Sequence, residues 1–149
     1  MRDLKVAIGA DHAGFELKEK IVEYLKAKNI EYKDFGTYST DSCDYPKIGK
    51  EVAEEVANKN FNKGILVCGS GIGMSIVANK VKGIRAALCW NIATAKSSRT
   101  HNDANILCLA ERVTQSSLVL EMVDLWLKTD FEGGRHQARV DMIESDISV

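Results

Sequence analysis

A cysteine stands between an apolar run and a glycine-rich turn in the middle of the chain. Cys68 follows the apolar residues 65–67 and precedes three glycines at alternate positions, Gly69, Gly71 and Gly73. Apolar and long side chains then recur at helical spacing, as Ile72, Ile76 and Lys80. The pattern predicts a buried strand, a tight turn and a helix.

Such a turn can stabilise negative charge. The first amides of the following helix have no intrahelical partner, so they can hold an anion or an oxygen that becomes anionic in a reaction. The same field favours the thiolate form of Cys68. The predicted chemistry is that of a base or nucleophile with a stabiliser for its transition state beside it. A buried structural cysteine before a structural turn explains this stretch equally well.

Three familiar phosphate-binding motifs do not fit these glycines. A dinucleotide fingerprint needs glycine or alanine where Met74 stands, and an acidic residue about 20 positions further on, where residues 87–90 are apolar. A P-loop needs lysine after its last glycine, but Phe15 follows the pair Gly9 and Gly14. A cysteine phosphatase loop has arginine six residues after its cysteine, which is again the position of Met74.

Further polar groups stand in loops that flank predicted strands. Asp11 and His12 follow the first strand, and His101 and Asn102 precede the last one. We expect these loops to gather with the Cys68 turn at the strand ends, where open α/β sheets bind ligands. The three histidines of the chain all fall in candidate site segments, the third being His136.

Arginines provide candidate phosphate ligands. Arg135 and Arg139 are four positions apart and would project from one face of a helix, as paired guanidinium groups that bind phosphate do. A solvated basic face explains the same pair. Arg112 is either a third phosphate ligand or a surface charge.

Strands and helices alternate along the whole chain. We predict strands at 4–9, 30–35, 65–68, 84–89 and 105–109, with helices between them and a further helix at 116–128. This order predicts one α/β domain over residues 1–149, a doubly wound, Rossmann-like fold with a five-stranded parallel sheet and helices on both faces. Met122 and Trp126 make the helix at 116–128 so apolar that it either forms a subunit interface or is wedged in the core.

Composition excludes several classes of protein. The 20 basic and 21 acidic residues nearly cancel, so no net field favours nucleic acid or a membrane surface. No apolar run reaches the length of a membrane span, and the first residues lack a signal-peptide pattern. The four cysteines form no close pair, so they indicate neither a zinc site nor disulfides. We therefore expect a cytoplasmic protein.

Five segments together resemble type B ribose-5-phosphate isomerases, a family that includes the galactose-6-phosphate isomerase subunits. The matching segments, in order along the chain, are residues 9–15, 44–46, 68–73, 98–103 and 132–136. The resemblance implies an aldose–ketose isomerase that acts on phosphorylated sugars without a metal or other cofactor. It also implies a homodimer, possibly a tetramer, whose active site lies at the subunit interface.

The resemblance assigns the catalytic roles residue by residue. Cys68 would be the base that moves a proton between C2 and C1, and Ser70 would handle protons on the substrate oxygens. His101 with Asp11 would open the sugar ring. The backbone amides that would hold the enediolate belong to Gly69, Gly71, Ile72 and Gly73.

The remaining implied roles concern binding. Tyr45 and Asn102 would contact the substrate. The phosphate would be held by His12, Arg112, Arg135 and Arg139, the last two from the other subunit.

Two other functions remain open at this level. The substrate could be a six-carbon sugar phosphate of the allose or galactose type, because pocket depth decides between pentose and hexose. A non-catalytic sugar-phosphate sensor is the other alternative, although a sensor would not need both Cys68 and His101.

Overall fold

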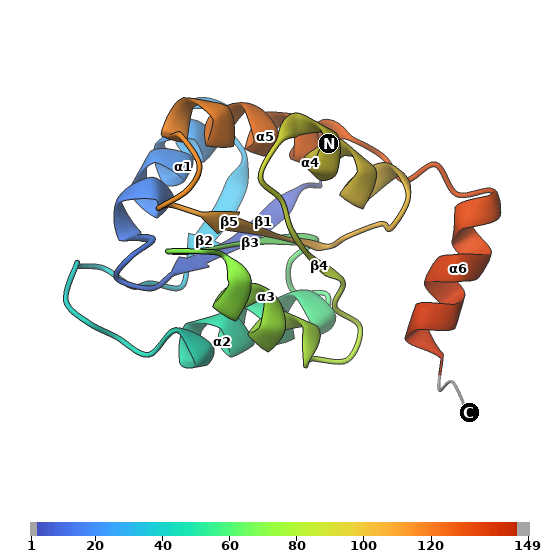
Figure 1. The fold of residues 1–149 in the computed structure, drawn as a ribbon, viewed down its shortest axis with the longest axis horizontal. Coiled ribbons are helices and arrows are strands. Elements are labelled where there is room, and N and C mark those ends of the chain that lie inside the picture. The colour runs from blue at the N-terminus through green and yellow to red at the C-terminus, as the bar shows by residue number, and fades with distance from the viewer. Residues whose placement is uncertain (1–2, 146–149) are drawn as a thin grey trace.

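The computed structural model describes residues 3–145, which form a five-stranded parallel sheet with helices on both sides (Figure 1). The strands are β1 (Lys5–Ala10), β2 (Glu31–Asp34), β3 (Lys63–Cys68), β4 (Ala86–Leu88) and β5 (Ile106–Ala110), in the spatial order β2-β1-β3-β5-β4. The helices are α1 (Phe15–Ala27), α2 (Tyr45–Ala57), α3 (Ile72–Asn79), α4 (Ile92–Thr100), α5 (Ser116–Lys128) and α6 (Arg135–Glu144). The predicted fold class is confirmed. The predicted domain limits, 1–149, extend beyond the described residues at both ends.

Two apolar cores lie on the two faces of the sheet. Helices α1, α4 and α5 cover one face and α2 and α3 cover the other, while α6 extends away from the body at one end (Figure 1). Alternate residues of β3 contribute to different cores: Ile65 and Val67 face the α1–α5 side, and Leu66 and Cys68 face the α2–α3 side. This period-two alternation on fully buried strands follows from the pleat.

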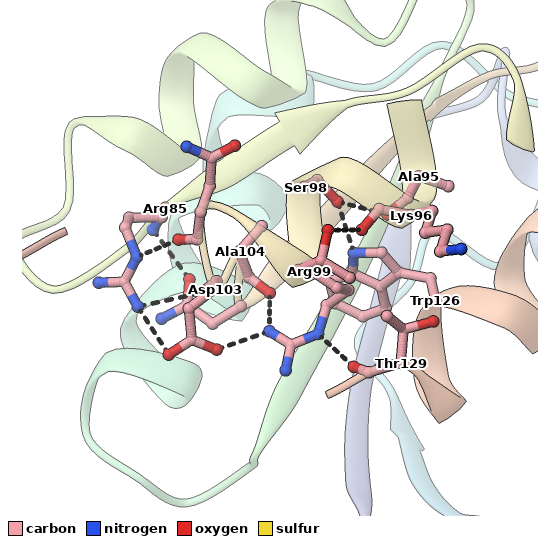
Figure 2. Close-up of polar contacts among 12 residues, drawn as sticks. Arg85, Ala95, Lys96, Ser98, Arg99, Asp103, Ala104, Trp126 and Thr129 are labelled. Carbon is pink, nitrogen blue, oxygen red and sulfur yellow. Dashed lines mark hydrogen bonds and ion pairs between the residues drawn. The ribbon is translucent and has the colours of Figure 1, made fainter. Parts of the chain in front are cut away.

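Helix α5 is a core helix. Met122 and Trp126 are fully buried among side chains of α1, α4 and the sheet. The Trp126 indole N–H donates a hydrogen bond of 3.1 Å to the Ser98 hydroxyl on α4 (Figure 2). The subunit-interface interpretation of these two side chains is therefore wrong, and the core interpretation is right.

The strand order places two loops at the point where the winding of the sheet reverses. From β1 the chain passes to β2 at one edge of the sheet. From β3 it passes to β4 at the opposite edge and then returns to β5, which lies between β3 and β4. The loops after β1 and β3 therefore flank a crevice at the carboxyl edge of the sheet, the usual ligand site of such folds. Among residues 3–145, no helix has both the length and the apolar character that a membrane span needs.

Candidate active site

Cys68 ends β3 and faces an open cavity of about 470 Å³ at the carboxyl edge. Only 5% of the residue is exposed. Its sulfur accepts a hydrogen bond of 3.1 Å from the backbone N–H of Gly71. Gly71 has φ +77°, a left-handed conformation that starts α3 directly beside the sulfur. An N–H donor and a helix N-terminus both favour negative charge beside the sulfur.

Eight of the residues proposed from the sequence line this cavity. They are Asp11, His12, Tyr45, Cys68, Gly69, Ser70, Gly73 and Arg112. They come from the loops after β1, β3 and β5 and from the start of α2. The carboxyl ends of adjacent parallel strands bring these loops together, as the fold prediction required.

Two of the glycines leave room for functional side chains. A Cβ on Gly73 would lie 2.6 Å from the Tyr45 ring, and one on Gly69 would lie 3.0 Å from a terminal nitrogen of Arg112. The Arg112 side chain therefore packs closely against the turn that carries Cys68. The Arg112 amide also donates to the Gly69 carbonyl at 3.0 Å, which fixes the start of that side chain.

Hydrogen bonds to the backbone orient the two polar groups after β1. The Cys43 amide donates to Nδ1 of His12 at 3.2 Å, so the imidazole carries its proton on Nε2 when neutral. Asp11 accepts a hydrogen bond of 3.0 Å from the Gly14 amide at the start of α1. Gly14 packs so closely on β3 that a Cβ there would lie 2.5 Å from the Val67 carbonyl oxygen.

Gly71 and Ile72 belong to the same turn without lining the cavity. The Gly71 amide is directed to Cys68, and the Ile72 amide donates to the Ser70 hydroxyl at 3.2 Å. The Ile72 side chain is exposed at 53%.

Four other proposed residues lie elsewhere in the chain. His101 and Asn102 follow α4 and lead into the amino end of β5, while Arg135 and Arg139 are exposed on α6. The expectation that all the polar loops meet at one edge of the sheet is therefore wrong for residues 100–105. That loop precedes β5, so it lies at the amino edge, opposite Cys68.

His101 instead forms a cluster with the start of α6. Its ring stacks on that of His136, with centroids 4.4 Å apart and planes inclined by 16°. Burial, together with His101 and Arg135, lowers the pKa of His136. Glu132 completes the cluster, and one ligand atom from each of the three residues lies within 4.8 Å of the others. Stacked rings do not suit a shared metal ion, because an ion must lie in the plane of each imidazole.

Sequence reasoning missed three contributors to the Cys68 site. Ala13 and Val113 line the cavity, and the Cys43 amide sets the His12 tautomer. Ala13 and Val113 could have been inferred as neighbours of His12 and Arg112. No sequence signal points to Cys43, whose contact depends on the path of the loop between β2 and α2.

Comparison with known proteins finds a matching family and similar sequences. The family model described as Ribose/Galactose Isomerase matches residues 6–143. The chain is 47% identical over 141 residues to the ribose-5-P isomerase B of Listeria innocua, with 95% of each chain covered.

Solved structures agree with the fold over the same span. The ribose-5-phosphate isomerase B of Clostridium thermocellum superposes with a TM-score of 0.93 at 52% identity, covering 95% of each chain. The enzyme of Mycoplasma genitalium, solved with bound ribulose-5-phosphate, gives a TM-score of 0.91 at 43% identity, again over 95% of each chain. With a match over nearly its whole length in sequence and in structure, the chain belongs to the ribose/galactose isomerase family.

Proposed function

We propose that this chain interconverts ribose 5-phosphate and ribulose 5-phosphate through an enediolate. The observation that carries the proposal is the Cys68 sulfur at the helix N-terminus, facing a cavity that His12 and Arg112 also line. Relatives that match about 95% of the chain include ribose-5-phosphate isomerases B, and one of these has been solved with ribulose-5-phosphate. A proton-transfer base, an oxyanion stabiliser and a phosphate anchor are the three parts that this isomerisation needs.

Cys68 is the base in this proposal. Its thiolate removes the proton from C2 of the open-chain aldose, and the C–H electron pair forms the C1–C2 double bond. The carbonyl pair moves onto O1, where the amides of the cavity-lining residues Gly69, Ser70 and Gly73 stabilise the charge. The thiol then returns the proton to C1, while the C2 hydroxyl loses its proton and becomes the ketone. Ser70, exposed at the cavity, exchanges protons with the two oxygens.

A second copy of the chain completes the site. One chain holds Asp11 and Cys68 at the carboxyl edge and His101 at the opposite edge. Helix α6 extends from the body with Arg135 and Arg139 exposed, where it can reach a neighbour (Figure 1). Exposed apolar side chains that a partner could cover lie on α3, before α4 and on α6: Ile72, Ile76, Trp90, Met142 and Ile143.

In the resulting homodimer each site combines two half-sites. The Cys68 cavity of one chain receives His101 and Asn102 of the other chain for ring opening and substrate contact. The two exposed arginines of α6 join His12 and Arg112 around the phosphate. Burial of the α6 arginines against a phosphate dianion supplies the binding energy that orients the reacting carbons.

The decisive experiment measures isomerisation by the purified protein with ribose 5-phosphate, in EDTA. Hexose 6-phosphates of the allose and galactose type are assayed in parallel, and kcat/KM is expected to be highest for the pentose. Loss of activity in EDTA would contradict the metal-free mechanism, and a higher value for a hexose would reassign the substrate.

Removal of the thiol tests the base. Cys68→Ala is expected to lower kcat by ~10² to 10⁴ while substrate binding is kept. Cys89→Ala is the matched control, because that thiol is also buried but lies in the other core. Near-normal turnover by Cys68→Ala would reject the role of the sulfur. Absence of turnover in the wild type, with ribose 5-phosphate still bound, would instead indicate a sensor.

A further inference from the structure

A small cavity of about 240 Å³ lies at the amino edge of the sheet, on the side opposite the Cys68 site. Lys63, the first residue of β3, lines it together with Arg85 and Asn105, which immediately precede β4 and β5. Cys68 is the last residue of the same β3 strand, five residues from Lys63. At about 3.3 Å per residue, roughly 16 Å of strand separates the two sites.

The charged side chains around this cavity are mainly cationic. Its basic members are Lys59, Lys63, Arg85 and Arg99, and its one acidic member is Asp103. The nitrogens of Arg85 are occupied: Nε donates to the Asn102 carbonyl at 2.9 Å, Nη2 donates to the Asp103 carbonyl at 2.9 Å, and Nη1 pairs with Glu144. Arg85 therefore adds positive electrostatic potential to the cavity, although its nitrogens already have partners. The single carboxylate of Asp103 offsets only part of the positive charge of the four basic side chains.

Arg99 is held in place but keeps one nitrogen available. Its side chain is 7% exposed; Nε donates to the Thr129 carbonyl at 3.0 Å, and Nη1 donates to Asp103 at 2.8 Å and to the Ala104 carbonyl at 2.7 Å (Figure 2). Nη2 has no hydrogen-bond partner within residues 3–145. No buried side-chain nitrogen of the described residues lacks a partner, so Nη2 is accessible at the cavity wall and can donate to an anion there.

Lys63 supplies a second unused donor. Its ammonium forms no hydrogen bond or ion pair with any residue of the described part of the chain, and it lies 5.4 Å from the centre of the Trp126 ring. The Arg99 guanidinium carbon lies 5.8 Å from the same ring. Burial and the charge of Arg99 lower the pKa of Lys63 to about 8, although Asp103 and Asp130 act in the opposite direction. An anion between the two cations would relieve this repulsion.

We propose that this cavity binds a phosphoryl dianion, with Lys63 Nζ and Arg99 Nη2 as its donors. The volume admits inorganic phosphate or the phosphate end of a small ester, and it is below the 300 Å³ or more of most ligand pockets. The bound dianion would brace the segment from Arg99 to Asn105, which carries His101 and Asn102. The site is separate from the proposed catalytic cavity and does not depend on the isomerase assignment.

Trp126 provides a local reporter for the test. Its buried indole N–H gives one of two tryptophan signals in a ¹H–¹⁵N spectrum, and Trp90, exposed at 58%, gives the other. The Trp90→Phe variant lacks the Trp90 signal, so the signal that remains is assigned to Trp126. The full chain is titrated with inorganic phosphate and with glycerol 3-phosphate, each against sodium chloride of equal ionic strength. Saturable movement of the Trp126 signal with either phosphate, but not with chloride, is expected, and the two titrations distinguish the free ion from the ester.

Variants locate the effect. Lys63→Gln is expected to raise the Kd for phosphate, measured from the Trp126 signal, roughly tenfold or more, because one charge-assisted hydrogen bond is lost. Lys50→Gln removes the same charge from an exposed pair with Glu54 and is expected to leave that Kd unchanged. Arg112→Gln weakens phosphate at the catalytic cavity only, so the Trp126 response is expected to persist. A Trp126 response equal in chloride, unaltered by Lys63→Gln or lost in Arg112→Gln would overturn the proposal.

Discussion

Complementation between two inactive variants tests the shared active site most directly. Cys68→Ala removes the base, and His101→Ala removes the group that opens the ring. In β5, Ala110 pairs with Cys68, and Asn105 lies five residues earlier, at the opposite edge. Strand geometry therefore puts roughly 16 Å between Cys68 and the start of β5, and His101 lies beyond that point. Each of the two groups must come within about 3 Å of the sugar atom on which it acts, and these atoms are close together in one sugar. Because the two groups are much farther apart in one chain, one chain cannot supply both of them to one substrate.

The expected magnitude follows from the two-fold arrangement. In an equal mixture of the two variants that has been dissociated and reassembled, half of the dimers are mixed. Each mixed dimer has one site lacking both groups and one site with both groups intact. About a quarter of wild-type kcat per chain should therefore return, although each parent is nearly inactive. The same fraction holds for a tetramer, provided that each site is shared by two chains.

The assay is isomerisation of ribose 5-phosphate by the reassembled mixture. Two affinity tags allow the mixed dimers to be purified, and their activity is expected to be about half that of the wild type. Each parent taken through the same dissociation and reassembly is the control for recovery. An activity no higher than the mean of the two parents would refute the shared site and would place both groups in one chain.

Further predictions concern the phosphate anchor, the glycines and one buried cation. Arg135→Ala should raise KM for the sugar phosphate by ~10- to 100-fold with kcat nearly kept, because one charge-assisted contact is lost; an unchanged KM would exclude the residue from the site. Gly14→Ala should lower the free energy of unfolding by about 1–3 kcal/mol in urea, since its Cβ meets a backbone carbonyl oxygen at 2.5 Å; unaltered stability would mean that α1 shifts freely. The pKa of Lys63 is lowered to about 8 in the fold, so the unfolded chain binds more protons between pH 8 and its ordinary value near 10.4. The stability of the wild type relative to Lys63→Gln should therefore rise from pH 7.5 to pH 9.5, and a difference that is constant with pH would contradict the lowered pKa.

Local pattern was sufficient for the elements and for half of the site. Apolar runs predicted the buried strands, apolar residues at helical spacing predicted the helices, and alternate glycines predicted the turn after Cys68. These patterns are visible in the sequence because they depend only on residues that are near one another in the chain. The rule that parallel strands end at a common edge then correctly placed Asp11 and His12 beside Cys68.

Tertiary structure alone decided the rest. A loop before a strand lies at the opposite edge from a loop after one, so His101 is separated from Cys68 although both had been expected near the strand ends. Hydrophobicity could not tell whether Trp126 meets a partner or a core, because both bury apolar surface equally well. The cationic cavity combines Lys63, Arg85 and Arg99, which are far apart in sequence and adjacent only because β3, β5 and β4 are neighbours in the sheet. Periodicity reports which face of an element is buried, and only the packing of elements reports what it is buried against.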